Sequence, residues 1–222
     1  MESILQVVDL KLYPSSAPFA ALVLAHGAGA GQASPWMKNT AAGLAERGLT
    51  TATFDFPYMT ARRSAPDRAP VLEQAWREAI ERARTELGGL PLVIGGKSMG
   101  GRMASHVASQ GGAGDLRGLI FFGYPLHPPG KPEQRRDVHL PAIREPMLFV
   151  QGAADPFGTG DEIRELLPKL QHATLHEVPG GDHSFKVPKR LGNAETVMAG
   201  IMDIAAAWAR TLAKREKAEG RR

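Results

Sequence analysis

The stretch that decides the fold is PLVIGGKSMGGRMASHVAS, residues 91–109. An apolar run at 92–94 leads into a cluster of glycines, a single hydroxyl follows at Ser98, and the residues after it have a helical composition. This pattern predicts a strand, a sharp turn and a helix in direct succession. Glycine is expected two positions before and after Ser98, because a side chain at either position would collide with neighbouring backbone.

The turn predicts a nucleophile at Ser98, because Gly96 and Gly100 give it the G-x-S-x-G spacing. The hydroxyl would stand at the N-terminus of the following helix, where free N–H groups and the helix dipole favour negative charge. Gly96, Lys97 and Ser98 also resemble the end of a phosphate-binding loop. That motif needs glycine at position 91, where this chain has Pro91. The sequence therefore argues against a nucleoside triphosphatase.

A serine nucleophile needs a base within hydrogen-bonding distance and an acid that orients the base. Asp155 follows the apolar run at 147–151, and His183 lies in a glycine-rich loop after the run at 173–178. Taken singly, Asp155 is typical of a turn before proline and His183 of an exposed loop. Both nevertheless follow strand ends in the order Ser98, Asp155, His183, and sites of parallel sheets lie at that edge. We predict that these three residues form a catalytic triad.

A tetrahedral intermediate on Ser98 would need hydrogen-bond donors for its oxyanion. We expect one donor to be the backbone N–H of Met99, and the second that of Ala28, with Gly29 as the next choice. The loop that holds Ala28 reads HGAGAG at 26–31. It lacks the third glycine of the G-x-G-x-x-G dinucleotide motif, so a dinucleotide site is the weaker interpretation.

Other histidines and acids do not displace this choice. His26 is expected to shape its own loop, and Asp55 ends a predicted strand from which we expect it to contact Arg102. Asp182 is expected to point away from the site, and Asp161 to begin a helix. The remaining histidines fall in a helix, in the last strand or its flank, or in a proline-rich segment: His106, His172, His176, His127 and His139.

Apolar β-rich runs alternate with longer helical patterns along the chain, which predicts a mostly parallel sheet with helices on both faces. The predicted strands are 4–12, 20–25, 50–55, 91–95, 117–123, 146–151 and 173–178. The predicted helices are 35–47, 69–87, 99–110, 160–170 and 193–217.

Length and composition are those of one globular domain over residues 1–222. The chain has no cysteine, which excludes disulfides and a thiol nucleophile. Neither a signal peptide nor an apolar run long enough for a membrane span is recognised, so we expect a cytoplasmic protein with no membrane contact. Neither metal nor organic cofactor is expected, and the sequence does not indicate an oligomeric state.

The formal net charge of +4 comes entirely from residues 210–222, which carry six basic and two acidic side chains. A basic, helix-forming terminus is usually a solvated, frayed end, and that is the interpretation favoured here. A contact with nucleic acid would need a clustered basic surface and is not expected.

Residues 124–145 form the longest irregular segment and contain five prolines. At this length the segment is too short for a multi-helix lid, so we expect an open, shallow site for a small ester. Six basic residues near strand ends would suit an anionic substrate, although a solvated surface is the favoured interpretation: Arg62, Arg63, Arg68, Lys131, Arg135 and Arg136.

Four motifs carry a resemblance to a known family: AHGAG at 25–29, FDFPY at 54–58, GGKSMGGR at 95–102 and GYPLHPPG at 123–130. With the order Ser98, Asp155, His183, the chain resembles an α/β-hydrolase over almost its whole length. More narrowly it resembles the KANL/Tex branch, a group of compact, dienelactone-hydrolase-like proteins. The resemblance implies an α/β-hydrolase fold of about seven strands without a large cap domain. Dienelactone hydrolases proper have cysteine where this chain has Ser98.

The expected function is that of a serine hydrolase acting on a small carboxylester or thioester through an acyl-enzyme. The alternative is a catalytically silent binding protein on the same fold, because the fold alone does not establish activity and some relatives are non-catalytic complex subunits.

Overall fold

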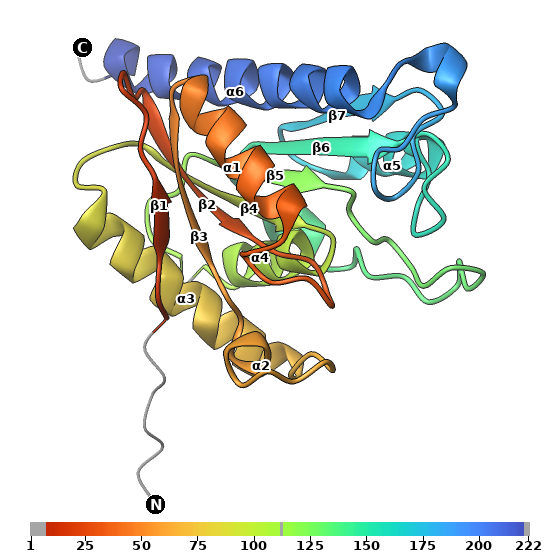
Figure 1. Ribbon diagram of the computed structural model, residues 1–222, viewed down its shortest axis with the longest axis horizontal. Coiled ribbons are helices and arrows are strands. Elements are labelled where there is room, and N and C mark those ends of the chain that lie inside the picture. Colours follow the sequence, from red (N-terminus) through yellow and green to blue (C-terminus); the bar gives the residue numbers. More distant parts are fainter. Residues whose placement is uncertain (1–7, 112, 220–222) are drawn as a thin grey trace, which may run out of the picture.

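The computed structural model describes residues 8–111 and 113–219. Seven strands form one sheet in the order β1-β3-β2-β4-β5-β6-β7 (Figure 1). All neighbours are parallel except β1, which pairs with β3 in the antiparallel direction. The strands are β1 (Lys11–Tyr13), β2 (Ala20–Ala25), β3 (Leu49–Phe54), β4 (Leu92–Lys97), β5 (Gly118–Phe122), β6 (Met147–Gly152) and β7 (Ala173–Val178).

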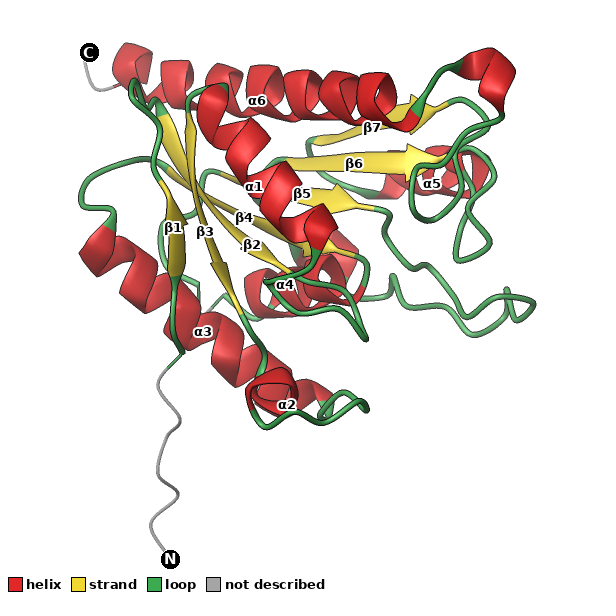
Figure 2. Ribbon diagram, in the orientation of Figure 1, coloured by secondary structure: helices red, strands yellow, loops and turns green. Residues whose placement is uncertain are grey.

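Helices cover both faces of the sheet, as Figure 2 shows. One face packs against α1 (Pro35–Glu46) and α6 (Ala194–Glu219). The other packs against α3 (Ala69–Glu86), α4 (Met99–Ser109) and α5 (Gly160–Leu166). A four-residue helix, α2 (Pro57–Thr60), follows β3.

The apolar runs of the sequence become central strands because both faces of such a strand are buried. Along β2, Ala21, Val23 and Ala25 join the core beneath α3 and α4, whereas Leu22 and Leu24 join the core beneath α1 and α6. All six residues of β2 are buried. The fold thus matches the predicted parallel sheet covered on both faces.

Two element boundaries differ from the predicted ones by more than two residues. The first strand begins at Lys11, so residues 8–10 of the range 4–12 are not in the strand, and 4–7 lie outside the described residues. The helix predicted at 160–170 ends at Leu166, because Pro168 cannot continue it, and a 3-10 turn follows at Leu167–Lys169. The segment 124–145 contains one 3-10 turn, Leu140–Ala142, and no lid of helices.

The C-terminal helix corrects the expectation of a frayed tail from residue 210. α6 continues to Glu219, and Leu212 and Ala213 on it are buried. The Arg210 guanidinium lies 4.0 Å from the centre of the Phe19 ring and donates a hydrogen bond to Arg47 O. The apolar stripe of the helix extends far enough to hold this part of the basic segment on the sheet. Residues 220–222 lie outside the described residues.

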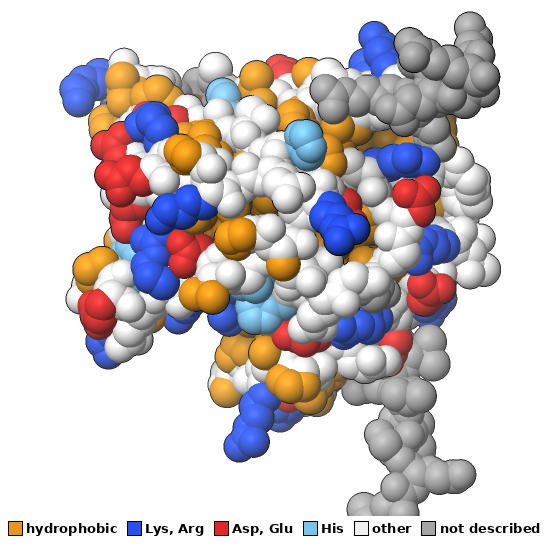
Figure 3. Space-filling model, turned by 180° about the vertical axis from the view of Figure 1, so that it is seen from behind, with side chains coloured by type: hydrophobic (Ala, Val, Ile, Leu, Met, Phe, Trp, Pro, Cys, Tyr) orange, Lys and Arg blue, Asp and Glu red, His pale blue; other side chains and the backbone are white. Residues whose placement is uncertain are grey.

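The surface of the described residues bears on the expectations about membranes and charge. Within residues 8–111 and 113–219, no helix combines the length and the apolar composition that crossing a bilayer requires. On the face shown in Figure 3, Asp and Glu side chains lie among the Lys and Arg side chains.

Candidate active site

Ser98 occupies a strained turn between β4 and α4. Its backbone has φ 49° and ψ −115°, a conformation that residues other than glycine rarely adopt. A Cβ at Gly96 would lie 2.7 Å from Ala25 O, and one at Gly100 would lie 2.5 Å from the same oxygen. Both glycines are therefore required, since β2 passes too close to the turn for any side chain.

The structure brings the hydroxyl of Ser98, the imidazole of His183 and the carboxylate of Asp155 into one chain of hydrogen bonds. Ser98 Oγ lies 2.9 Å from His183 Nε2, and His183 Nδ1 lies 2.7 Å from Asp155 Oδ2. Because an ionised carboxylate only accepts, His183 Nδ1 donates, and neutral Nε2 is left to accept the proton of Ser98. Three segments distant in sequence thus meet at the carboxyl ends of β4, β6 and β7.

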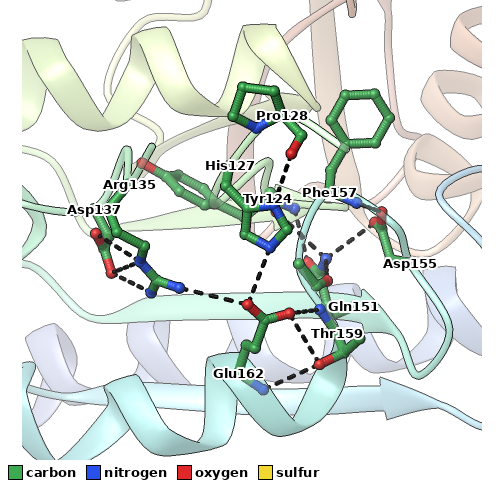
Figure 4. A network of polar contacts seen from close by, with 11 residues as sticks. Tyr124, His127, Pro128, Arg135, Asp137, Gln151, Asp155, Phe157, Thr159 and Glu162 are labelled. Atoms are coloured by element: carbon green, nitrogen blue, oxygen red, sulfur yellow. Dashed lines mark hydrogen bonds and ion pairs between the residues drawn. The ribbon is translucent and has the colours of Figure 1, made fainter. Parts of the chain in front are cut away.

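Asp155 is fully buried and is held by contacts other than that with His183 (Figure 4). Gln151, at the end of β6, donates from Nε2 to Asp155 Oδ2 at 3.0 Å. The backbone N–H of Phe157 donates to Oδ1 at 2.8 Å, which is an Asx turn. The turn contact expected of Asp155 is therefore present, with one carboxylate oxygen fixing the loop and the other facing the imidazole of His183.

The loop that carries His183 packs tightly against the ends of β4 and β6. A Cβ at Gly152 would lie 2.3 Å from Gly181 O, so only glycine permits this approach. Lys97 Nζ donates a hydrogen bond to His183 O. The ring of Phe157 lies against the imidazole with 4.3 Å between ring centres. These contacts fix the ring of His183, whose side chain is 20% exposed.

Lys97, the residue before Ser98, has a side chain whose pKa is shifted. Burial lowers its pKa to about 8, and the carboxylates of Asp155 and Asp182 oppose this shift. Its ammonium also lies 5.3 Å from the centre of the Phe185 ring. Lys97 therefore connects the end of β4 to the loop of His183.

The loop after β2 approaches Ser98 closely. A Cβ at Gly27 would lie 3.5 Å from Ser98 Cβ, and Ala28 and Met99 line the same cavity as Ser98. Met99 is the first residue of α4, where a backbone N–H has no partner within the helix. The two N–H groups expected to bind an oxyanion thus belong to segments that border the nucleophile.

His26 anchors this loop and is fully buried. Its Nδ1 donates to Gly27 O at 2.8 Å, and its Nε2 accepts from the N–H of Phe56 at 3.1 Å. Burial lowers its pKa, which keeps the ring neutral as this hydrogen-bonding pattern requires. His26 therefore shapes the loop, as the sequence predicts.

The expected contact between Asp55 and Arg102 is wrong. Asp55 Oδ1 accepts from the backbone N–H of Gln32 at 2.7 Å, on the side of the loop after β2. Arg102, one helical turn after Ser98, points instead into the cavity next to the nucleophile. Strand-end position alone does not give the direction of the Asp55 side chain.

The remaining candidates lie away from the nucleophile. Asp182 accepts from the N–H groups of Ser184 and Lys186, and Asp161 lies in the first turn of α5, as expected. His106 contacts Glu73, His127 contacts Glu162, and His139 contacts Ser105. The last two histidines lie in or beside β7: His176 and His172.

A cavity of about 560 Å³ opens over the hydroxyl of Ser98. Apolar and basic side chains line it together with Ser98 and His183, among them Trp36, Leu72, Phe157, Arg102 and Arg136. Within the described residues, no group of three or more His, Asp or Glu side chains is placed to hold a metal ion. The arrangement is suited to acyl transfer to a hydroxyl, because Ser98 and His183 border one space and Asp155 contacts His183 from behind.

Sequence reasoning missed Gln151 and Lys97 as supports of the site. Each is a polar residue at the end of an otherwise apolar strand, MLFVQG in β6 and LVIGGK in β4. A polar side chain in such a strand needs a buried hydrogen-bonding partner. Its presence in an apolar run is therefore the signal in the sequence that could have identified these two supports.

Comparison with known proteins agrees with this architecture. A family model described as an alpha/beta hydrolase domain matches residues 18–211. A dienelactone hydrolase from Anabaena variabilis superposes with a TM-score of 0.71 at 20% identity, covering 93% of both chains. The esterase domain of a Rhodothermus marinus protein gives 0.67 at 15% identity, covering 92% of both chains. An a/b serine hydrolase without lid from Xanthomonas campestris gives 0.64 at 17% identity, covering 94% of this chain and 88% of that one.

Proposed function

The chain belongs to the alpha/beta hydrolase family, and we propose that it is a serine hydrolase that cleaves a small ester in the cytoplasm. The substrate class is a carboxylester or a thioester. Ser98 is the nucleophile, His183 the general base and acid, and Asp155 the residue that orients His183. No metal or organic cofactor is needed for this chemistry.

The observation that carries the proposal is the alignment of the three side chains at one cavity. The distances of 2.9 Å from Ser98 Oγ to His183 Nε2 and of 2.7 Å from His183 Nδ1 to Asp155 Oδ2 are those of direct hydrogen bonds. The strain at Ser98 supports the same interpretation. Ser98 is not a glycine, yet its backbone is held at positive φ in a turn that packs closely against β2.

In the first half of the reaction, Ser98 Oγ attacks the ester carbonyl carbon while His183 Nε2 takes the hydroxyl proton. The negative charge of Asp155 stabilises the imidazolium that forms. The carbonyl oxygen becomes an oxyanion, for which the N–H groups of Met99 and Ala28 are the proposed donors. Each such donor typically contributes about 3 kcal/mol to transition-state stabilisation.

In the second half, His183 gives its proton to the leaving alkoxide or thiolate, and the acyl group remains on Ser98. Water then attacks the acyl carbon, with His183 taking one proton from the water and returning it to Ser98 Oγ. Proton and charge therefore balance over the cycle. The carboxylic acid and the alcohol or thiol are the products.

The cavity supports a small substrate. Its volume of about 560 Å³ lies within the range usual for small-molecule sites, and the segment 124–145 contributes no helical lid above it. We expect short p-nitrophenyl esters and thioesters to be hydrolysed in preference to long-chain triglycerides.

Hydrolysis of a panel of short esters and thioesters tests the proposal. The wild type is expected to show an initial burst of p-nitrophenol equal to the enzyme concentration where deacylation limits turnover. Asn39→Ala, at an exposed position of helix α1 that does not line the cavity, is a control for handling and folding. A folded protein that hydrolyses none of the panel and binds the esters unchanged would instead indicate the catalytically silent binding protein.

A further inference from the structure

Two arginines line the cavity that holds the nucleophile. Arg102 follows Ser98 by four residues, and its N–H donates to Ser98 O at 3.0 Å, so both residues lie on one side of the first turn of α4. Long side chains on a helix lean toward its N-terminus, which brings the guanidinium of Arg102 toward the serine. Arg136 reaches the same cavity from the segment 124–145.

Neither guanidinium has a partner among residues 8–111 and 113–219. Arg102 Nε is buried and makes no hydrogen bond, and no carboxylate lies within ion-pair distance of either side chain. Burial lowers the pKa of Arg102, and the positive charge of Arg136 lowers it further, whereas Tyr124 and Glu73 oppose the shift. Two neighbouring cations that make no ion pair with the described residues reduce the stability of the free protein, so they need a reason other than folding.

Other arginines near the cavity form ion pairs with carboxylates. Arg135, next to Arg136 in sequence, contacts both Asp137 and Glu162 (Figure 4). Arg63 contacts Asp67 with 2.6 Å between Nη2 and Oδ1. Asp67 also lines the cavity, but the charge of Arg63 offsets that of its carboxylate. Among the described residues, the two arginines that line the cavity, Arg102 and Arg136, form no such ion pair.

The backbone of Arg136 is held on both of its polar groups. Its N–H donates to Leu126 O at 2.8 Å, and its carbonyl accepts from the hydroxyl of buried Tyr124 at 2.9 Å. A surface residue without a role would not need a buried tyrosine to fix it. The fold therefore presents the side chain of Arg136 to the cavity from a rigid position.

From this arrangement we infer that the substrate carries a carboxylate, which Arg102 and Arg136 bind beside the scissile ester. The inference rests on the proposed hydrolase activity and specifies its substrate class. A guanidinium offers a planar pair of donors that matches the two oxygens of a carboxylate. The ligand would supply the ion pair that the described residues do not provide for these arginines.

Paired esters of the same shape test the charge preference. Monoethyl succinate is compared with ethyl 4-methylpentanoate, in which an isopropyl group replaces the carboxylate, for an anion on the acyl side. Acetoxyacetate is compared with acetoxyacetone for an anion on the alcohol side. We expect kcat/KM to favour the anionic member of one pair by about tenfold or more.

Substitution of the arginines separates this preference from other causes. Arg102→Met and Arg136→Met are each expected to lower the ratio of kcat/KM within the favoured pair about tenfold or more, and Arg102→Lys to restore part of it. Arg135→Met removes the same charge from the neighbouring residue and is expected to leave the ratio unchanged. A ratio near one in the wild type, or an equal ratio in all variants, overturns the inference.

Binding of a non-reactive anion tests the site even if no ester is cleaved. Glutarate is expected to bind the wild type in calorimetry and to raise its Tm, and both effects are expected to disappear in Arg102→Met. Without ligand, the Tm of Arg102→Met is expected to equal or exceed that of the wild type, because an unpaired charge is removed. No glutarate binding at tens of millimolar, or binding of inorganic phosphate alone, contradicts the carboxylate assignment.

Discussion

Two serine–histidine pairs lie along α4, one at its N-terminal end and the other two helical turns further on. At the cavity, Ser98 Oγ is 2.9 Å from His183 Nε2. Further along the helix, Ser105 Oγ is 2.7 Å from His139 Nε2. The distances are nearly equal, yet the two pairs have different surroundings.

The two pairs differ in the partner of the second imidazole nitrogen and in the exposure of the serine. His183 Nδ1 donates to the buried carboxylate of Asp155, whereas within the part of the chain that the structure describes no carboxylate contacts His139. Burial lowers the pKa of His139 to about 4, and the charges of His106 and Arg102 act in the same direction, whereas Asp137 and Glu73 oppose it. Ser105 is fully buried. A hydroxyl beside an imidazole is therefore not sufficient for a nucleophile, since an orienting acid and a cavity are also needed.

The largest expected effect separates the two hydroxyls. Ser98→Ala is expected to lower kcat for a short ester by at least about 10³-fold, because it removes the nucleophile. Ser105→Ala is the matched control and is expected to keep kcat within about twofold. Steady-state kinetics on both purified variants makes the comparison, and retention of more than a few per cent of activity by Ser98→Ala would contradict it.

The next comparison concerns two carboxylates that each contact a histidine: Asp155 beside His183 and Glu73 beside His106. Asp155→Asn is expected to lower kcat about 10³-fold, because the amide cannot stabilise the imidazolium and leaves the wrong ring nitrogen protonated. Glu73→Gln, which changes the carboxylate beside His106 near the C-terminal end of α4, is expected to change kcat by no more than about twofold. Equal effects of the two substitutions on kcat would show that Asp155 has no special part in the reaction.

Acid titration of stability tests the surroundings of His139. Because the pKa of His139 is lowered in the folded state, the unfolded chain binds the proton first as pH falls below about 6.5. The associated stability is complete above that pH and is lost progressively toward pH 4. We expect the free energy of unfolding of the wild type, relative to His139→Gln, to fall by about 2 kcal/mol between pH 7 and pH 4.

Urea denaturation followed by circular dichroism at several pH values measures this difference. Denaturation curves that keep a constant separation between the wild type and His139→Gln over this range would show that His139 is not held neutral by its surroundings.

The smallest expected effect concerns the contribution of Ser105 to the stability of the fold. Its hydroxyl contacts His139 and donates to Arg102 O at 2.6 Å, so Ser105→Ala is expected to cost about 1 kcal/mol of unfolding free energy. Urea denaturation at pH 7 measures this cost. A Ser105→Ala protein as stable as the wild type would mean that these contacts contribute nothing net.

Most of the fold follows from local patterns in the sequence. The apolar runs of β2 and β6 and the glycines around Ser98 are recognisable without tertiary contacts, and the ends of parallel strands must share one edge of the sheet. That is why Asp155 and His183 could be placed near Ser98 from their order alone. Their roles in catalysis remain predictions.

The supports of the site depend on contacts between distant segments, which a local pattern does not contain. Gln151 binds both Asp155 and the N–H of Tyr124, and the second contact crosses from β6 to the end of β5. The partner of Asp55 was predicted wrongly for the same reason, because it depends on the direction in which its side chain leaves the strand. The packing of Arg210 on Phe19 likewise joins the two ends of the chain.

The central claim is that Ser98, aligned with His183 and Asp155, is the nucleophile. The most direct measurement is labelling with a fluorophosphonate, followed by trypsin digestion and mass spectrometry. Cleavage after Lys97 and Arg102 places Ser98 in the peptide 98–102 and Ser105 in the peptide 103–117. The account predicts one adduct, on peptide 98–102, that is absent in Ser98→Ala. An adduct on peptide 103–117, or no adduct on the folded wild type, would contradict it.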